Sequence, residues 1–295
     1  MILVIGNSGQ LARSLVSSAA DRGTELVSIG RPEMDILRPA TLEKKISNEN
    51  VELIINTAAF TDVERAEENE AEAISLNSEA PGEISVIAKK YGIPIIHIST
   101  DYVFDGNSSR DYSEIDIANP LSMYGRSKLL GEQSVAEGNA RHLIFRTSWI
   151  YSVYGTNFVK KMLELAEQRS EIQVVNDQFG NPTYAVDLAQ ELLKISESVI
   201  GQKNLDNIPW GLYHLTGKGT ASWAELAQKV MQVSSEINGP TAQIASVTSS
   251  EFDTAARRPK NSALNNELVT KTFGSQLPDW QSGVRRCVSH ILKGL

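Results

Sequence analysis

Short apolar runs alternate with longer amphipathic stretches through the first half of the chain. The apolar runs are residues 1–5, 25–29, 51–56, 93–99 and 142–148. Each run is continuously apolar, which is typical of strands that are buried on both faces. The stretches between them predict helices near residues 10–22, 40–49, 70–91 and 120–138. Regular alternation of strand and helix predicts an α/β fold built on a parallel sheet with right-handed crossovers.

The pattern becomes less regular after about residue 150. Helices are expected at residues 156–169, 184–200, 221–234 and 279–292, and short strands at 172–175, 211–215 and 243–247. This half is expected to form a smaller α/β substrate lobe over the carboxyl edge of the sheet. The predicted division is 1–150 for the sheet domain and 151–295 mainly for the smaller lobe, with some later segments returning to the sheet domain.

Composition narrows the class of protein. The chain has 295 residues, a formal net charge of −8 and no run rich in lysine or arginine, so nucleic-acid partners are not expected. No apolar run approaches the ~18 residues of a membrane span, and membrane partners are not expected either. Cys287 is the single cysteine, which excludes an intramolecular disulfide and favours a reducing, cytoplasmic location. The four histidines lack metal-ligand spacing, so no metal site is expected, and His97 and His142 are interpreted as structural strand residues.

A glycine-rich turn follows the first apolar run. Gly6, Gly9 and Ala12 have the spacing G-x-x-G-x-x-A at the start of the first expected helix. The first glycine permits a tight turn, the second lets the backbone approach a pyrophosphate at the helix N-terminus, and the small third residue lets the helix pack closely on the strand. The sequence therefore predicts a Rossmann-type doubly wound sheet that binds a dinucleotide. The alternative is a plain strand-to-helix turn.

The next two strand ends refine the cofactor prediction. Enzymes that prefer NAD often carry an acidic residue after the second strand, whereas this chain has Arg31, which can pair with a 2′-phosphate. NADPH is therefore the predicted cofactor, and NADH stays possible. Asp35 and Ile36 are expected to flank the adenine, and the small residues Ala58 and Ala59 to leave room for the cofactor.

The candidate chemistry lies after the fourth strand and in the helix that follows. Ser99, Thr100 and Asp101 stand at a strand end, and Tyr124 and Lys128 lie one helical turn apart. A tyrosine has a pKa of about 10, too high for efficient proton exchange at neutral pH, and a nearby ammonium is expected to lower it. Ser99 or Thr100 is expected to hold the substrate oxygen while Tyr124 supplies the proton. A Tyr-x-x-x-Lys spacing alone also occurs on ordinary helix surfaces.

Six segments together resemble a known family: the GxxGQxx turn, STDYVFDG, YGRSK, FRTSWIY, NDQFGNPTY and ARRPKNSAL. The chain is similar to the extended short-chain dehydrogenase/reductases and, within them, to the dTDP-4-dehydrorhamnose reductases, from Met1 to about His290. The resemblance implies an oxidoreductase that uses NADPH or NADH to reduce the C4 ketone of dTDP-4-dehydro-L-rhamnose, the last step of dTDP-L-rhamnose synthesis. The implied partner is a dTDP-sugar.

The resemblance also implies roles for individual residues. Tyr124 would donate the proton, Lys128 would bind the nicotinamide ribose and Thr100 would assist. The pyrophosphate would be held by Gly9, Gln10 and Leu11. The cofactor would be lined by Asp35, Ile36, Ala59, Phe60 and Thr61. The sugar nucleotide would be bound by Asp101, Trp149, Gln178, Asn181, Arg257 and Arg258, the two arginines at its diphosphate.

One departure concerns assembly. Some members of this family form magnesium-linked dimers through glutamates at positions that are Ser14 and Val186 here. Neither side chain supplies a carboxylate, and Asp187 and Glu191 are only near the second position. A magnesium-bridged dimer is therefore not expected, and both a monomer and a homodimer stay open.

Two other interpretations stay open. A nucleotide-sugar dehydratase or epimerase of the same superfamily would share the fold, but a dehydratase needs Asp-Glu after the strand-end threonine, where this chain has Asp101-Tyr102. A regulatory protein like the β subunit of methionine adenosyltransferase would also share the fold, and the Tyr124–Lys128 pair does not exclude it.

Overall fold

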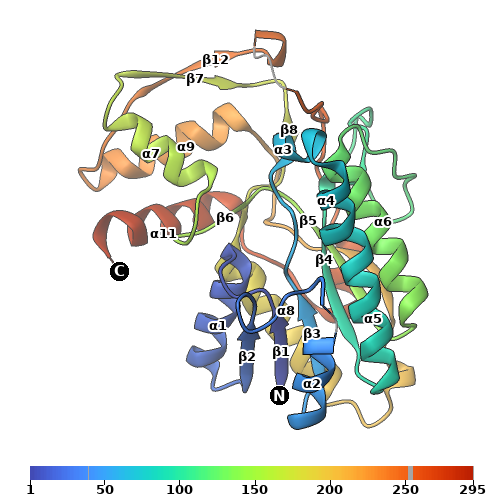
Figure 1. Ribbon diagram of the computed structural model, residues 1–295. Helices are drawn as coiled ribbons and strands as arrows, with labels where there is room; N and C mark the ends of the chain where they lie inside the picture. Colours follow the sequence, from blue (N-terminus) through green and yellow to red (C-terminus); the bar gives the residue numbers. More distant parts are fainter. Residues whose placement is uncertain (39, 252–254, 295) are drawn as a thin grey trace.

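A computed structural model describes residues 1–38, 40–251 and 255–294, and its centre is a six-stranded sheet (Figure 1). All neighbouring strands run parallel, in the order β10-β5-β4-β3-β1-β2. The strands are β1 (Ile2–Ile5), β2 (Leu26–Ile29), β3 (Leu53–Asn56), β4 (Ile95–Thr100), β5 (His142–Thr147) and β10 (Gly211–His214). The strand order reverses direction at β1, where doubly wound folds bind ligands beyond the carboxyl ends of the strands. The predicted fold class is confirmed.

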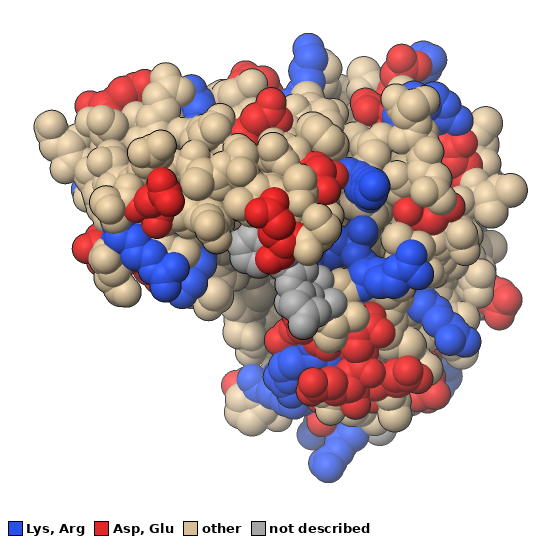
Figure 2. All heavy atoms as spheres, turned by 90° about the horizontal axis from the view of Figure 1, so that it is seen from above, with Lys and Arg blue, Asp and Glu red and all other residues tan. Residues whose placement is uncertain are grey.

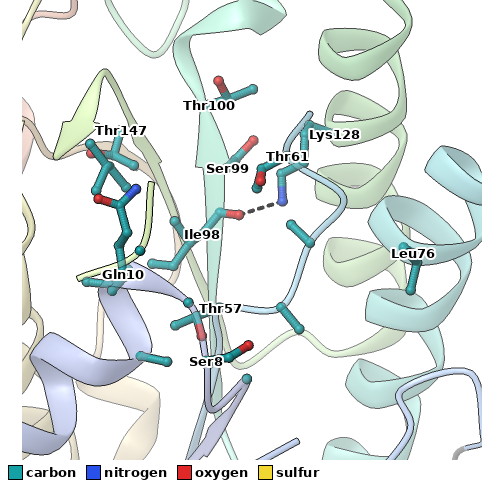
Figure 3. Close-up of a pocket in the computed structure, with 18 of the residues that line it drawn as sticks. Ser8, Gln10, Thr57, Thr61, Leu76, Ile98, Ser99, Thr100, Lys128 and Thr147 are labelled. Atoms are coloured by element: carbon teal, nitrogen blue, oxygen red, sulfur yellow. Dashed lines mark hydrogen bonds between the residues drawn. The ribbon is translucent and has the colours of Figure 1, made fainter. Parts of the chain in front are cut away.

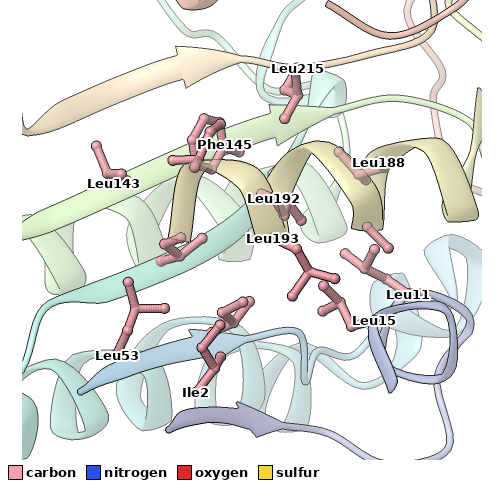
Figure 4. Packing of buried hydrophobic residues seen from close by; sticks show 14 of the residues in the cluster. Ile2, Leu11, Leu15, Leu53, Leu143, Phe145, Leu188, Leu192, Leu193 and Leu215 are labelled. Atoms are coloured by element: carbon pink, nitrogen blue, oxygen red, sulfur yellow. The ribbon is translucent and has the colours of Figure 1, made fainter. Parts of the chain in front are cut away.

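Helices cover both faces of this sheet. α1 (Gln10–Arg22) and α8 (Ala185–Ile200) pack together on one face, where their leucines meet β1, β3 and β5 (Figure 4). α2 (Ala40–Asn48), α5 (Ala80–Lys90) and α6 (Met123–Gly138) lie on the other. Ile2 and Val4 of β1 point into the first core and Leu3 and Ile5 into the second. A strand covered on both faces needs apolar residues at every position, which explains its continuous apolar run.

One long continuous helix changes its pitch in the middle. α4 (Glu70–Ile74) continues through a π-helical turn (Ser75–Glu79) into α5. Pro81 has no N–H to donate to the carbonyl of Asn77, and the missing hydrogen bond favours the wider turn. Gly131 of α6 packs directly against that carbonyl, so closely that a Cβ would overlap it. The π turn and Gly131 therefore bring α6 close to this helix.

The second half of the chain builds a smaller lobe above the carboxyl ends of the strands (Figure 1). Its helices are α7 (Phe158–Ala166), α9 (Trp223–Glu236) and α11 (Trp280–Lys293), which share a separate apolar core. Beside them, β7 (Glu171–Val175) pairs in parallel with β12 (Gln243–Val247). Not all of this half stays in the lobe, because α8 and β10 return to the central sheet and α10 (Glu267–Phe273) packs beside β10.

Short elements connect the two lobes. β6 (Ile150–Tyr151) pairs with β9 (Thr183–Tyr184), and β8 (Phe179–Gly180) pairs with β11 (Ala221–Ser222). These two-residue strands, α10 and the polar helix α3 (Val63–Glu68) were not predicted. None of them is long enough to show a clear hydrophobic period.

The face seen from above carries charged residues of both signs (Figure 2). In the view from above, acidic and basic side chains are interspersed among uncharged residues (Figure 2). Within the part of the chain that the structure describes, no helix has the length and apolar content needed to cross a bilayer.

The contact between α6 and the π turn is tested by Gly131→Ala. Alanine normally stabilises a helix interior over glycine by about 0.5–1 kcal/mol. Here the added methyl group has no space, so we expect a loss of about 1–3 kcal/mol in the free energy of unfolding. Urea denaturation measures the change, with exposed Gln133→Ala of the same helix as the control. A variant as stable as the control would contradict this account of the packing.

Candidate active site

A cavity of about 840 Å³ lies at the carboxyl edge of the sheet, between the two lobes. Its walls come from the segments that follow β1 to β5, which include Trp149, from α6, and from Gly155, Thr156, Asn157 and Trp223 of the second half. Figure 3 shows Ser8 and Gln10 at one end of the cavity and Thr100, Ser99 and Lys128 near the other. A single space therefore joins the glycine-rich turn to the predicted catalytic residues.

The turn after β1 is shaped to receive an anion. Gly6 has φ +110°, and a Cβ there would lie 2.7 Å from the Thr57 hydroxyl oxygen, so only glycine fits. Gly9 is the N-cap of α1, its side-chain position is open, and no side chain of the described residues caps the helix. The first N–H groups of α1 therefore have no side-chain acceptor beside an open space, which suits a pyrophosphate. Leu11 and Ala12 also line this end.

Gln10 connects this turn to the smaller lobe. Its side-chain oxygen accepts hydrogen bonds from the Ser152 hydroxyl and the Asn157 amide, each at 3.0 Å. One turn further along α1, the guanidinium of Arg13 lies 4.1 Å from the centre of the Tyr154 ring. The Gln10 side-chain oxygen is thus engaged within the protein, and the backbone N–H and side-chain amide N–H groups are the donors left to meet a phosphate.

The segment after β2 presents an exposed arginine. Arg31 lines the cavity, its side chain is 66% exposed, and its nearest carboxylate, that of Asp35, is 3.8 Å away. Asp35 itself is not among the described lining residues, and its carboxylate accepts a hydrogen bond from the Leu37 N–H. Ile36 and Met34 form the wall instead. Arg31 is therefore free to turn towards a ligand, whereas Asp35 shapes the backbone.

The loop after β3 is fixed by hydrogen bonds to the buried amide side chain of Asn77. Ala58, Ala59 and Thr61 line the cavity, whereas Phe60 is absent from the described lining. The Asn77 side chain accepts from the Phe60 N–H at 2.7 Å and donates to the Phe60 carbonyl at 2.9 Å. Phe60 is buried, and its two backbone hydrogen bonds to Asn77 fix the loop. The small residues beside Phe60 form the cavity wall.

Tyr124, Thr100 and Lys128 come together at the cavity, as the sequence predicts. Tyr124 shares a hydrogen bond with the Thr100 hydroxyl, and the Lys128 amino group donates to the Ile98 carbonyl at 2.7 Å (Figure 3). Burial raises the pKa of Tyr124 to about 12, a shift that the Thr100 hydrogen bond opposes and the Asp101 charge reinforces. Burial also lowers the pKa of Lys128 to about 8.

These shifts correct one prediction. Lys128 was expected to lower the pKa of Tyr124, but the pKa of Tyr124 is raised. The physical reason is burial of the two side chains, which disfavours both the phenolate and the ammonium. At neutral pH, Tyr124 is therefore a protonated phenol.

Asp101 is a third buried group at this end. Its carboxylate accepts hydrogen bonds from the hydroxyls of Thr100 and Ser148, each at 3.1 Å. Burial raises the pKa of Asp101 to about 6, although its hydrogen bonds with Ser262, Ser148 and Thr100 oppose the shift. The described wall around Tyr124 thus favours the neutral forms of Tyr124, Lys128 and Asp101.

A buried ion pair supports the site from behind. Arg146 of β5 donates two hydrogen bonds to Glu132 of α6, at 2.8 and 2.7 Å, and Glu132 also accepts from the Ser99 hydroxyl. The Arg146 guanidinium lies 5.0 Å from the centre of the Phe104 ring. This network was not predicted, although Glu132 follows Lys128 by one helical turn and the spacing could have shown that they share a face.

Trp149 is held in a constrained position at the cavity wall. Its backbone has φ 47°, unusual for a bulky residue, and its ring stacks on Trp223 with centroids 3.6 Å apart. A Cβ on Gly180 would lie 2.5 Å from the Trp149 ring. The predicted contact between Trp149 and a ligand must therefore use the part of the Trp149 ring that Trp223 and Gly180 leave uncovered.

Four predicted substrate residues are not gathered around the cavity. The described lining omits Gln178, Asn181, Arg257 and Arg258. The Asn181 side chain links Gly219 to Leu264 through backbone hydrogen bonds. Arg258 is paired with Glu64, and Arg257 is exposed.

Other cavity residues were not predicted. They include Asn7, Ser8, Thr57, Leu76, Thr147, Ser148, Thr156, Asn157 and Trp223. Several of them directly follow predicted strand ends, which was an available signal, whereas Trp223 comes from a distant helix start.

The side chains at and near the two positions where some family members bind a bridging magnesium ion make contacts within this chain. Ser14 donates to the Gln10 carbonyl, Val186 packs against the core of the smaller lobe, and Asp187 and Glu191 pair with Arg286 and Lys194. Across residues 1–38, 40–251 and 255–294, no three or more His, Cys, Asp or Glu side chains are arranged to hold a metal ion.

Comparison with known proteins identifies the family. The model of the RmlD substrate binding domain matches residues 1–293. A dTDP-4-dehydrorhamnose reductase from Sinorhizobium fredii is 40% identical over 291 residues, which cover 99% of this chain and 97% of that protein. The chain belongs to the dTDP-4-dehydrorhamnose reductase family. The resemblance predicted from the sequence motifs is confirmed.

Solved structures of this family agree with the fold. A dTDP-4-dehydrorhamnose reductase from Clostridium acetobutylicum has a TM-score of 0.90 at 32% identity, covering 100% of this chain and 99% of that one. A dTDP-4-dehydrorhamnose reductase from Bacillus anthracis in complex with NADP has a TM-score of 0.87 at 33% identity, covering 97% of each chain. A nicotinamide cofactor is thus the cofactor class of the family, and the open turn at Gly9 fits its phosphates.

The buried pair behind the site is tested by Glu132→Leu and by the double variant Glu132→Leu/Arg146→Met. The single change leaves the Arg146 charge buried without its partner, which we expect to cost about 3–5 kcal/mol in the free energy of unfolding. The double variant replaces the pair by apolar groups and should recover most of that loss. Urea denaturation measures both, and a double variant no more stable than the single one would refute this interpretation. Glu267→Leu, which removes an exposed ion pair, is the control and should change little.

Proposed function

We propose that this chain reduces the C4 ketone of dTDP-4-dehydro-L-rhamnose to dTDP-L-rhamnose with NADPH or NADH. The observation that carries the proposal is the Tyr124–Thr100 hydroxyl pair in the same cavity as the anion-receptive turn at Gly9. Membership of the dTDP-4-dehydrorhamnose reductase family supports the choice of substrate. Tyr102 stands where a dehydratase of the superfamily needs a glutamate, so the dehydratase alternative is not favoured.

The residues of the chain account for the proton in this reaction. A nicotinamide cofactor, when bound, supplies the hydride to the carbonyl carbon. Tyr124 is protonated at neutral pH and can give its proton to the carbonyl oxygen, because its pKa of about 12 keeps the phenol intact until the oxygen becomes basic. Thr100, next to Tyr124, would orient the same oxygen by turning its hydroxyl proton from Asp101 towards it. Lys128 is 2% exposed, and its amino group would turn from the Ile98 carbonyl towards the nicotinamide ribose.

The remaining predicted residues extend the proposal along the cavity. Gly6, Gly9, Gln10 and Leu11 would hold the pyrophosphate, and Ile36, Ala58, Ala59 and Thr61 would line the cofactor, with Asp35 and Phe60 shaping the loops behind. Asp101 and Trp149 would contact the sugar nucleotide. Gln178, Asn181, Arg257 and Arg258 lie outside the described lining and would bind substrate only after local rearrangement, in which Arg258 exchanges Glu64 for the diphosphate.

The activity is tested with Tyr124→Phe. Purified protein with NADPH and dTDP-4-dehydro-L-rhamnose should oxidise the cofactor stoichiometrically and form dTDP-L-rhamnose. Removing the phenolic proton should lower kcat about 10²–10⁴-fold with cofactor affinity retained. Absorbance and product analysis measure the reaction, with Tyr91→Phe, an exposed tyrosine at the C-terminal end of α5 and outside the described cavity lining, as the control. No reduction of this sugar by the wild-type chain would reject the proposal.

Cofactor preference is tested with Arg31→Ala. A charge-assisted hydrogen bond to the 2′-phosphate contributes about 1.5–3 kcal/mol, so KM for NADPH should rise roughly 10–100-fold while KM for NADH stays unchanged. Steady-state kinetics with both cofactors measure the effect, and Arg38→Ala, another exposed arginine near the same segment, is the matched control. Equal effects on the two cofactors would remove Arg31 from this role.

A further inference from the structure

Two buried polar side chains stand behind Lys128, outside the described cavity lining. Asn56 ends β3 and His97 lies on β4, and the two residues are direct partners in the parallel register. Asn56 is 1% exposed, His97 0% and Lys128 2%. The mechanism above does not use Asn56 or His97. Asn56 nevertheless contacts His97, and His97 in turn contacts the Lys128 amino group.

The orientation of the Asn56 amide follows from its neighbours. The N–H of Ala58 lies 3.2 Å from Asn56 Oδ1, and a backbone N–H can only donate, so this atom must be the carbonyl oxygen. The amide nitrogen Nδ2 therefore faces His97 Nδ1, at 3.1 Å. Because an amide nitrogen also only donates, His97 Nδ1 must accept.

This contact selects one tautomer of His97. Burial lowers the pKa of His97 well below its usual range, and the nearby Lys128 charge lowers it further, so the ring is neutral. With Nδ1 as an acceptor, the single ring proton resides on Nε2. His97 Nε2 lies 3.5 Å from Lys128 Nζ. The imidazole thus turns an N–H towards the lysine.

An N–H at this place disfavours the ammonium form of Lys128. An ammonium has three donors and no acceptor, so it meets the His97 N–H as donor against donor. A neutral amine has a lone pair that can accept the His97 N–H and can still donate to the Ile98 carbonyl at 2.7 Å. The other titratable and charged groups around Lys128 are Tyr124 and Glu132 on α6, and Arg146, which neutralises Glu132.

We propose that Asn56 and His97 are positioning residues that fix the imidazole tautomer facing Lys128 and thereby set how tightly Lys128 holds its proton. Asn56 acts through His97, and His97 acts through Lys128, so neither needs to touch substrate or cofactor. The kinetic consequence rests on the proposed function, whereas the tautomer does not.

Asn56→Asp is the matched substitution, since it keeps the shape and exchanges one donor for an acceptor. One carboxylate oxygen still accepts from Ala58, and the other now faces His97 Nδ1 and requires a proton there. The ring proton should move from Nε2 to Nδ1, and the Nε2 lone pair should then accept from the Lys128 ammonium. We expect kcat/KM to fall at alkaline pH as Lys128 loses its proton, and in Asn56→Asp this limb should move to higher pH by at least about one unit.

The tautomer itself is measured without cofactor or sugar. Long-range ¹H–¹⁵N spectra of the full chain, labelled at histidine and assigned with His97→Gln, identify which ring nitrogen carries the proton. We expect a proton on Nε2 in the wild type and on Nδ1 in Asn56→Asp. His142→Gln, at the amino end of β5, is the control and should leave both the His97 spectrum and the pH profile unchanged.

Three results would overturn the proposal. The first is a wild-type His97 that is protonated on Nδ1 or on both nitrogens at neutral pH, which can be seen even if Asn56→Asp fails to fold. The second is a pH profile shifted in Asn56→Asp without a change of tautomer, because the new carboxylate would then act through charge alone. The third is a changed tautomer with an unshifted profile. Failure of the reductase assay leaves the spectra unaffected, so the two proposals fail separately.

Discussion

The close approach of α6 to its neighbours is the constraint on which the site depends. Gly125 packs against the backbone of Tyr102 and Gly131 against that of Asn77, in both cases without room for a Cβ. Gly125 directly follows Tyr124, and Lys128 lies between the two glycines along the helix. A helix held at this distance brings a phenol and an amino group to the end of β4, and a larger side chain at either glycine would move both away together.

The same close packing determines the electrostatics of the site. Lys128 and Asp101 are each 2% exposed and Tyr124 is partly buried at the cavity wall, and burial shifts the pKa of each towards its neutral form. The nearby full charges, Glu132 and Arg146, neutralise each other. At neutral pH, pKa values of about 6 and about 8 still leave Asp101 ionised and Lys128 protonated. When Tyr124 gives its proton to the carbonyl oxygen it would become a phenolate, and the Lys128 ammonium, one helical turn away, is the group placed to stabilise that charge.

Much of the fold could be read from the sequence, because strands covered on both faces must be apolar throughout. The same holds for Tyr124 and Lys128, whose relation is local to one helix. The Glu132–Arg146 pair, the Trp149–Trp223 stack and the Asn56–His97 contact join residues from different elements, and no local pattern records which side chains meet across a sheet. The pKa of Tyr124 was wrongly predicted for a related reason, since spacing shows proximity to a cation but not the loss of water around both groups.

The contact of Gln10 with Ser152 and Asn157 has a consequence for protein engineering. The turn that would meet the cofactor phosphates and the lobe that would hold the sugar share this hydrogen-bonded joint, reinforced by Arg13 on Tyr154. A half taken from a relative would fit only if it supplies matching side chains to this contact. A chimaera that changes the sugar lobe must carry over both ends of the joint, or the phosphate turn will lose its support on that side.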